Sequence, residues 1–122
     1  MAVVAIVEDQ KANMKLVSAI LAQAGYDILP AFDAIEGVPL IQEHIPDLVL
    51  MDIHLPGMDG LEATRILKND TTTKHIPIVA LTARAMEGDR EQILAQGCDD
   101  YLSKPIRYKE LLDLVAQHLE RH

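Results

Sequence analysis

Short runs of consecutive apolar residues recur along this chain, and each is followed by turn residues and then by a segment with helical spacing. A strand that is apolar at every position is typical of a parallel sheet that is covered on both faces. Three runs have this character, and two shorter runs fit outer strands. The sequence therefore predicts five strands, at Val3–Val7, near Asp27–Ala31, at Leu48–Met51, at Ile78–Leu81 and at Asp100–Leu102.

Helical segments separate these runs. Pro30 interrupts the second run, and because proline cannot donate to a strand ladder we expect that strand at a sheet edge. Asp33 and Asp59 are candidate N-caps of the second and third helices, whereas Pro39 favours a late start or a kink in the second. Glycines follow the first and fourth segments as natural stops. The helices are expected from Met14 to Ala24, from about Ala34 to His44, from Gly60 to about Lys68, over roughly Met86–Gln96, and from Leu111 to the C-terminus.

Five strands that alternate with five helices predict an α/β fold of the flavodoxin-like (βα)5 kind, a parallel sheet between two helical layers. The chain has 122 residues, which suits one hydrophobic core, so we expect residues 1–122 to form one domain. In such sheets, ligands bind beyond the carboxyl ends of the strands. The functional residues are therefore expected just after the strands.

Charge and composition exclude several classes of function. The formal net charge is −8, Trp is absent and Phe occurs once, which argues against direct binding of nucleic acid. No apolar run approaches the length of a membrane span, and the chain reaches Glu8 and Asp9 too early for a signal peptide. A single cysteine, Cys98, fits a reducing compartment. We expect a cytoplasmic protein that binds neither nucleic acid nor membranes.

Polar residues follow four of the five predicted strands: Glu8, Asp9, Asp52, Thr82 and Lys104. Each alone is most often a turn or cap residue, but the predicted topology brings all five to one end of the sheet. Clustered carboxylates repel one another unless a cation joins them, and Mg²⁺ suits oxygen ligands. A carboxylate can also attack phosphorus, in a reaction that mainly needs positioning and charge stabilisation. The cluster therefore predicts a magnesium-dependent phosphoryl acceptor.

Four segments carry a resemblance to a known family. They are Glu8–Asp9, Leu48–Gly60, Leu81–Ala83 and Tyr101–Pro105. With them the sequence resembles response-regulator (CheY-like) receiver domains over essentially its whole length. Within that family it is most similar to stand-alone regulators of the DivK type, through Asn13–Leu16 and His75–Ala83. The resemblance implies a sheet of order 2-1-3-4-5.

The resemblance also implies a role for each residue of the cluster. Asp52 would be the phosphoacceptor, and Thr82 and Lys104 would contact the phosphoryl group. Mg²⁺ would be held by Glu8, Asp9, Asp52 and the backbone carbonyl of His54. Many members of the family have Asp where this chain has Glu8, whose longer side chain should still reach the metal, directly or through water.

A switch, a cis peptide bond and a set of partners are implied as well. Tyr101 would turn inward when Thr82 moves toward the phosphate, and the Lys104–Pro105 bond would be cis. The donor would be a phosphohistidine on a sensor histidine kinase or a histidine phosphotransfer protein. The fourth helix, fifth strand and last helix would contact a downstream protein. Such a chain is a signalling protein that catalyses only its own phosphorylation and dephosphorylation.

Other readings of the sequence are weaker. A flavin-binding flavodoxin has the same topology, but here two acidic residues occupy the first loop, without a phosphate cradle. A phosphatase of the haloacid-dehalogenase kind usually has a second Asp where this chain has His54. Two alternatives stay open: a receiver-like module that binds proteins without being phosphorylated, and a receiver domain from a hybrid histidine kinase.

Overall fold

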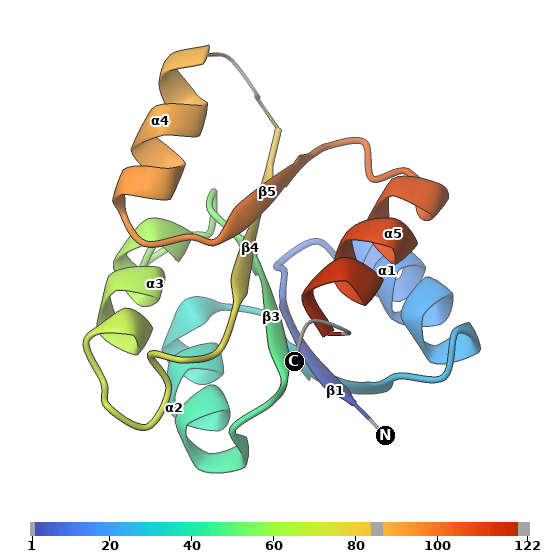
Figure 1. The fold of residues 1–122 in the computed structure, drawn as a ribbon, viewed down its shortest axis with the longest axis horizontal. Helices are drawn as coiled ribbons and strands as arrows, with labels where there is room; N and C mark the ends of the chain where they lie inside the picture. The colour runs from blue at the N-terminus through green and yellow to red at the C-terminus, as the bar shows by residue number, and fades with distance from the viewer. Residues whose placement is uncertain (1, 84–86, 120–122) are drawn as a thin grey trace.

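The computed structural model describes residues 2–83 and 87–119. Within these residues, five strands alternate with five helices along the chain (Figure 1). The elements are β1 (Val3–Val7), α1 (Lys11–Gln23), β2 (Asp27–Ala31), α2 (Ala34–His44), β3 (Leu48–Asp52), α3 (Gly60–Lys68), β4 (Ile78–Thr82), α4 (Glu87–Ala95), β5 (Asp100–Ser103) and α5 (Tyr108–Leu119).

The five strands form one parallel sheet in the order β2-β1-β3-β4-β5. This confirms the predicted α/β class and the implied strand order. It also confirms the edge position of β2, where Pro30 is in register with Ile6 of β1. β1, β3 and β4 have neighbours on both sides, which is why their sequences are apolar at nearly every position.

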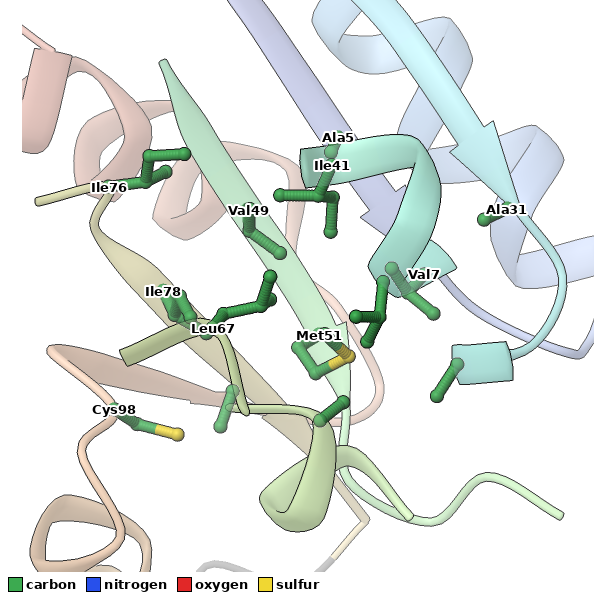
Figure 2. Close-up of a cluster of buried hydrophobic side chains, with 14 of the residues drawn as sticks. Ala5, Val7, Ala31, Ile41, Val49, Met51, Leu67, Ile76, Ile78 and Cys98 are labelled. Carbon is green, nitrogen blue, oxygen red and sulfur yellow. The ribbon is translucent and has the colours of Figure 1, made fainter. Parts of the chain in front are cut away.

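Alternate side chains of the central strands enter two separate cores, because successive residues of a strand point to opposite faces of the sheet. Figure 1 shows α1 and α5 on one face and α2, α3 and α4 on the other. Figure 2 shows part of the core under α2 and α3, where Val7, Val49, Met51 and Ile78 of the sheet meet Ile41 and Leu67 of the helices. The opposite core contains Ile6, Leu50, Leu81, Val17 and Leu111, among others. Each helical layer thus fixes the sheet from its own side.

The second helix has the predicted bounds, Ala34–His44, and the predicted cap, Asp33, although Pro39 lies within it. It begins at Ala34 and continues through Pro39, so the late start is wrong. The Asp33 side chain accepts a hydrogen bond of 2.7 Å from the Glu36 backbone N–H, and the Asp33 carbonyl accepts one of 2.9 Å from Gly37. This cap holds the first turn before the proline is reached, and the missing proline donor affects only one later bond.

Several other boundaries shift by one or a few residues. β3 ends with Asp52 and β4 with Thr82, because the ladder continues from Asp52 opposite Leu81 to a 3.2 Å bond between Ile53 N and the Leu81 carbonyl. The predicted start of the fourth helix, at Met86, lies outside the described residues, as do the last three residues of the chain. No helix within the described ranges is long and apolar enough to cross a membrane.

Candidate functional site

The carboxyl ends of β1, β3, β4 and β5 bring the predicted site residues together at one end of the sheet. Glu8 and Thr82 are fully buried and Asp52 is 2% exposed, whereas Asp9 is exposed. One carboxylate oxygen from each of Glu8, Asp9 and Asp52 lies within 4.8 Å of the other two. Three acidic groups therefore share one small volume at this end of the sheet.

Lys104 supplies the positive charge of the cluster. Its Nζ lies 2.8 Å from Glu8 Oε1 and 3.1 Å from Asp52 Oδ2. The side chain follows β5, and its backbone N–H donates a 2.7 Å bond to the Thr82 carbonyl. The Lys104–Pro105 peptide bond is cis. The ammonium group is therefore in contact with both buried carboxylates.

The loop after β3 holds the Asp52 carboxylate from the other side. Asp52 Oδ1 accepts a 2.9 Å hydrogen bond from the His54 backbone N–H. The His54 side chain is exposed, as expected for a ring at the rim. The two Asp52 oxygens thus have different partners, a backbone donor on one and an ammonium group on the other.

Gly60 allows α3 to begin directly behind Asp52. A Cβ at position 60 would lie 2.8 Å from the Asp52 carbonyl carbon and 2.6 Å from Ile53 Cα. The Asp59 side chain caps this helix by accepting a 2.8 Å bond from the Glu62 N–H. The local sequence Asp59–Gly60 therefore sets both where α3 starts and how closely it approaches the acceptor strand.

The protonation of the cluster follows from burial and mutual contact. Burial, followed by the interaction with Asp52, raises the pKa of Glu8 from 4.5 to about 7, although Lys104 opposes this. Burial also acts to raise the pKa of Asp52, but its interactions with Glu8, the His54 N–H and Lys104 outweigh burial and lower that pKa below 3.8. Burial acts to lower the pKa of Lys104, and its contacts with the two carboxylates raise it above 10.5. A proton shared by the pair therefore stays on Glu8, and Asp52 is ionised.

One buried carboxylate oxygen has no hydrogen-bond partner. Glu8 Oε2 accepts a 3.2 Å bond from the Gln10 N–H. Within the described residues Glu8 Oε1 accepts none, since its ion pair with Lys104 lacks hydrogen-bond geometry. A buried oxygen that is held only by this ion pair, beside two other carboxylates, is a costly arrangement that a divalent cation relieves. The residues present therefore fit a hard metal ion such as Mg²⁺.

The cluster opens into a cleft of about 480 Å³, through which a ligand can reach Asp52. A smaller cavity of about 240 Å³ lies beside it, between Thr82, the start of α3 and Ile93 of α4. The cleft is lined by Asp9, Gln10, Asn13, Asp52, His54, Ala83, Lys104 and Pro105. The sequence prediction gave Gln10 and Asn13 no role at the site. Their position in the sequence, just after the acidic pair and at the start of a helix, could have placed both residues near the site.

The two predicted switch residues lie on neighbouring strands. Thr82 is the last residue of β4 and is fully buried. Tyr101 of β5 is half-buried, pairs with Ala80 in register, and has the Arg90 guanidinium of α4 5.8 Å from its ring centroid. Tyr101 is therefore on the strand next to the one that ends in Thr82, and its ring is on the side of the sheet that α4 covers.

Comparisons with known proteins agree with this geometry. The family model of the response regulator receiver domain matches residues 4–116. The chain is similar to the polar-differentiation response regulator DivK of Brucella anthropi, with 44% identity over 116 residues, which are 95% of this chain and 94% of that protein. DivK of Brucella ovis is similar to the same extent.

Solved structures show the same fold. The chemotaxis response regulator CheY4 of Vibrio cholerae matches with a TM-score of 0.92 and 28% identity, over 98% of this chain and 99% of that one. The receiver domain of a sensor histidine kinase from Pseudomonas aeruginosa matches with a TM-score of 0.91 and 35% identity, over 98% of each chain. That structure has a magnesium ion coordinated in its active-site cleft. The chain described here belongs to the family of response-regulator receiver domains.

Proposed function

We propose that Asp52 accepts a phosphoryl group from a phosphohistidine, with Mg²⁺ as cofactor, as part of a two-component or phosphorelay pathway. The donor is a sensor histidine kinase or a histidine phosphotransfer protein. The observation that carries this proposal is the ionised Asp52 carboxylate at the base of an open cleft, with Lys104 Nζ 3.1 Å away. The negative charge of the nucleophile and a positive charge for the phosphoryl group are both in place.

Each residue of the cluster has a distinct task in this reaction. An Asp52 oxygen forms the new bond to phosphorus while the bond from phosphorus to the donor nitrogen breaks. The His54 N–H fixes the orientation of the Asp52 carboxylate through its 2.9 Å bond. In this proposal Lys104 and the Thr82 hydroxyl contact phosphoryl oxygens. All four residues lie at the same end of the sheet, so the reaction needs no large movement of any of them.

Glu8, Asp9, Asp52 and the His54 carbonyl would hold the Mg²⁺ ion. When bound, the ion supplies positive charge that neutralises the carboxylates and the phosphoryl oxygens. The unsatisfied oxygen of Glu8 is the feature of this chain that supports such a ligand set. Glu8 has to release its proton for that role, because a metal ligand must be the ionised carboxylate.

The output is a change in protein contacts. A phosphoryl group adds roughly −1.5 to −2 charge at this end of the sheet. Thr82 and the Tyr101 ring respond, and the change reaches the surface of α4, β5 and α5, where a downstream protein binds. In this proposal residues 1–122 act as one cytoplasmic receiver domain that contacts neither nucleic acid nor membrane.

Intact-mass measurement after incubation with acetyl phosphate and Mg²⁺ tests the proposal. The wild type should gain one phosphoryl group, and Asp52→Asn should gain none. Asp113→Asn is the matched control, because Asp113 is an exposed carboxylate on α5, away from the cleft. Absence of labelling in a folded wild type that is saturated with Mg²⁺ would instead favour the alternative, a module that binds proteins without phosphorylation.

A further inference from the structure

Two side-chain amides form a pair at the opening of the cleft. Gln10 follows Asp9 and is the N-cap residue of α1, yet its side chain makes no capping bond to the helix backbone. Instead, Asn13 Nδ2 donates a 2.7 Å hydrogen bond to Gln10 Oε1. Both residues line the same cleft as Asp52. The pair therefore lies where a donor has to enter, and its orientation is fixed by its own internal bond.

Each amide of this pair has hydrogen-bonding groups that make no hydrogen bond to a described residue. A primary amide has one carbonyl oxygen and two N–H groups. Among the described residues, the side chains of Gln10 and Asn13 hydrogen-bond only to each other, which leaves Asn13 Oδ1 and Gln10 Nε2 available to a ligand. A neutral side-chain acceptor and a neutral side-chain donor are thus available in the same cleft as the nucleophile.

A phosphohistidine donor presents a ring N–H that needs a hydrogen-bond acceptor in the cleft. In an in-line transfer the leaving group lies on the side of phosphorus opposite Asp52, that is, toward the opening of the cleft. The leaving group is an imidazole ring with phosphorus on one nitrogen and a proton on the other. That second N–H is desolvated as the ring enters, and it needs an acceptor to replace water.

We propose that the Gln10–Asn13 pair recognises the imidazole ring of the phosphodonor, with Asn13 Oδ1 accepting from the distal ring N–H. This inference rests on the proposed function, since it assumes that Asp52 is the acceptor. The donor enters with its distal nitrogen protonated. An Asp52 oxygen forms a bond to phosphorus, the phosphorus–nitrogen bond breaks, and its electron pair returns to the ring, which leaves as neutral imidazole. No further acid, base or redox partner is needed.

Three small phosphodonors separate recognition of the ring from the rest of the reaction. Phosphoimidazole has the ring and the phosphorus–nitrogen bond. Phosphoramidate has the same kind of bond without a ring, and acetyl phosphate has neither. The rate of Asp52 phosphorylation is measured by intact mass with each donor and saturating Mg²⁺. The variants are Asn13→Ala, Gln10→Ala and the double variant, and the control is Gln23→Ala, which removes an exposed amide from the other end of α1.

The proposal predicts a change in donor preference. Asn13→Ala should lower the rate with phosphoimidazole about threefold to tenfold, as loss of one hydrogen bond does, and leave the other two donors within about twofold. Gln10→Ala should act in the same direction, and the double variant should add little to Asn13→Ala, because the two side chains act as a unit. Gln23→Ala should behave as the wild type with all three donors.

Other outcomes would overturn the inference without touching the proposed function. An equal loss with all three donors means that the pair only supports the first turn of α1, and thermal unfolding of Asn13→Ala would show the same defect. An equal loss with phosphoramidate and phosphoimidazole means that the pair acts on the phosphorus–nitrogen bond and not on the ring. Unchanged rates throughout mean that the pair has no part in phosphotransfer. A wild type that no donor labels at Asp52 refutes the proposed function itself.

Discussion

Gly60 packs against the main chain of Asp52, with no room between them for even one side-chain carbon. An added Cβ would lie 2.8 Å from the Asp52 carbonyl carbon. The residue is not in the left-handed region of backbone conformation. It is therefore the close approach of α3 to the acceptor strand that requires glycine here, and any side chain has to push the two apart.

Gly60→Ala should lower the free energy of unfolding by about 1–3 kcal/mol, since backbone atoms must shift to accept the methyl group. It should also slow phosphorylation of Asp52, because the same shift moves the carboxylate. Urea unfolding followed by circular dichroism measures the first effect. Gly25→Ala is the comparison: nothing lies within 4 Å of its would-be Cβ, so its cost comes from its φ of 99° alone and should leave labelling unchanged. If Gly60→Ala has normal stability and normal labelling, α3 can move away from Asp52 at no cost, and the close approach is not required.

The stability of the metal-free protein should fall as the pH rises from about 4.5 to about 7. Burial and Asp52 raise the pKa of Glu8 to about 7, so in this window the folded state binds more protons than the unfolded state does. The pKa of Asp52 is lowered instead, so its contribution is lost only under more acidic conditions. Thermal unfolding across this range measures the slope.

Saturating Mg²⁺ should offset that loss of stability, and Mg²⁺ affinity should increase as Glu8 loses its proton. Glu8→Gln should flatten the pH dependence of stability and weaken Mg²⁺ binding by calorimetry. The ion's effect is read as the difference in melting temperature with and without it. A wild type and a Glu8→Gln variant with parallel pH profiles would show that Glu8 is not the group that titrates.

Lys104→Met should have opposite effects on metal binding and on phosphorylation. The lysine contacts Glu8 and Asp52, so its removal takes a competing cation from two carboxylates. Mg²⁺ affinity should rise about threefold to tenfold, which is roughly 1 kcal/mol of relieved repulsion. Labelling by acetyl phosphate should fall by at least tenfold, because the phosphoryl group loses a positive charge. Isothermal titration measures Mg²⁺ affinity, and intact mass measures labelling. The control is Lys15→Met, which removes an exposed lysine of α1.

Lys68 joins α3 to the opposite end of the sheet from the cleft. Its Nζ donates to the Ile76 carbonyl at 2.8 Å and contacts Asp99 Oδ2 at 2.8 Å, an oxygen that also accepts from the Ile78 N–H. Lys68→Met should cost about 1–3 kcal/mol, because a partly buried carbonyl loses its donor. Labelling of Asp52 should stay normal. Chemical unfolding is the measurement, and the exposed Lys74→Met should be neutral.

Arg90 should influence the position of the Tyr101 ring. Its guanidinium lies 5.8 Å from the ring centroid, and such a contact contributes about 0.5–1 kcal/mol at exposed sites. Arg90→Gln should therefore release the ring from this position, while Arg90→Lys keeps part of the interaction. NMR signals of the Tyr101 ring, recorded with and without beryllofluoride and Mg²⁺, report the change. Identical ring signals in Arg90→Gln and the wild type would refute the contact.

The central strands were predictable because burial on both faces makes their sequences apolar throughout, whereas the strand order came from the family resemblance. Val49 and Leu50 enter different cores, yet both must be apolar, so the run has no polar position. The convergence of Glu8, Asp52 and Lys104 follows from the same topology, since each comes at the end of a strand. Local sequence and strand order together therefore predicted most of the site.

What the sequence could not show depends on contacts between distant segments. Thr73 lies in a run of three threonines that gives no sign of burial in the sequence, yet it is fully buried and its hydroxyl donates to the Leu67 carbonyl at 2.7 Å. The close approach of Gly60 to Asp52 and the contacts of Lys68 with Ile76 and Asp99 arise only when helices dock on the sheet. Pro39 suggested a late start of the second helix, but the cap by Asp33, which the sequence did indicate, holds the first turn ahead of the proline.

The acceptor belongs to a strand, whereas most of the residues that line its cleft belong to loops, and this division sets what can vary independently. Asp52 is registered against Leu81 within the sheet, so its position is as rigid as that of the core beneath it. Gln10, His54, Ala83 and Pro105 come from four separate connections that tolerate replacement. Duplicated copies of such a chain could therefore diverge in partner choice and signal duration through rim substitutions alone, while inheriting one unchanged nucleophile.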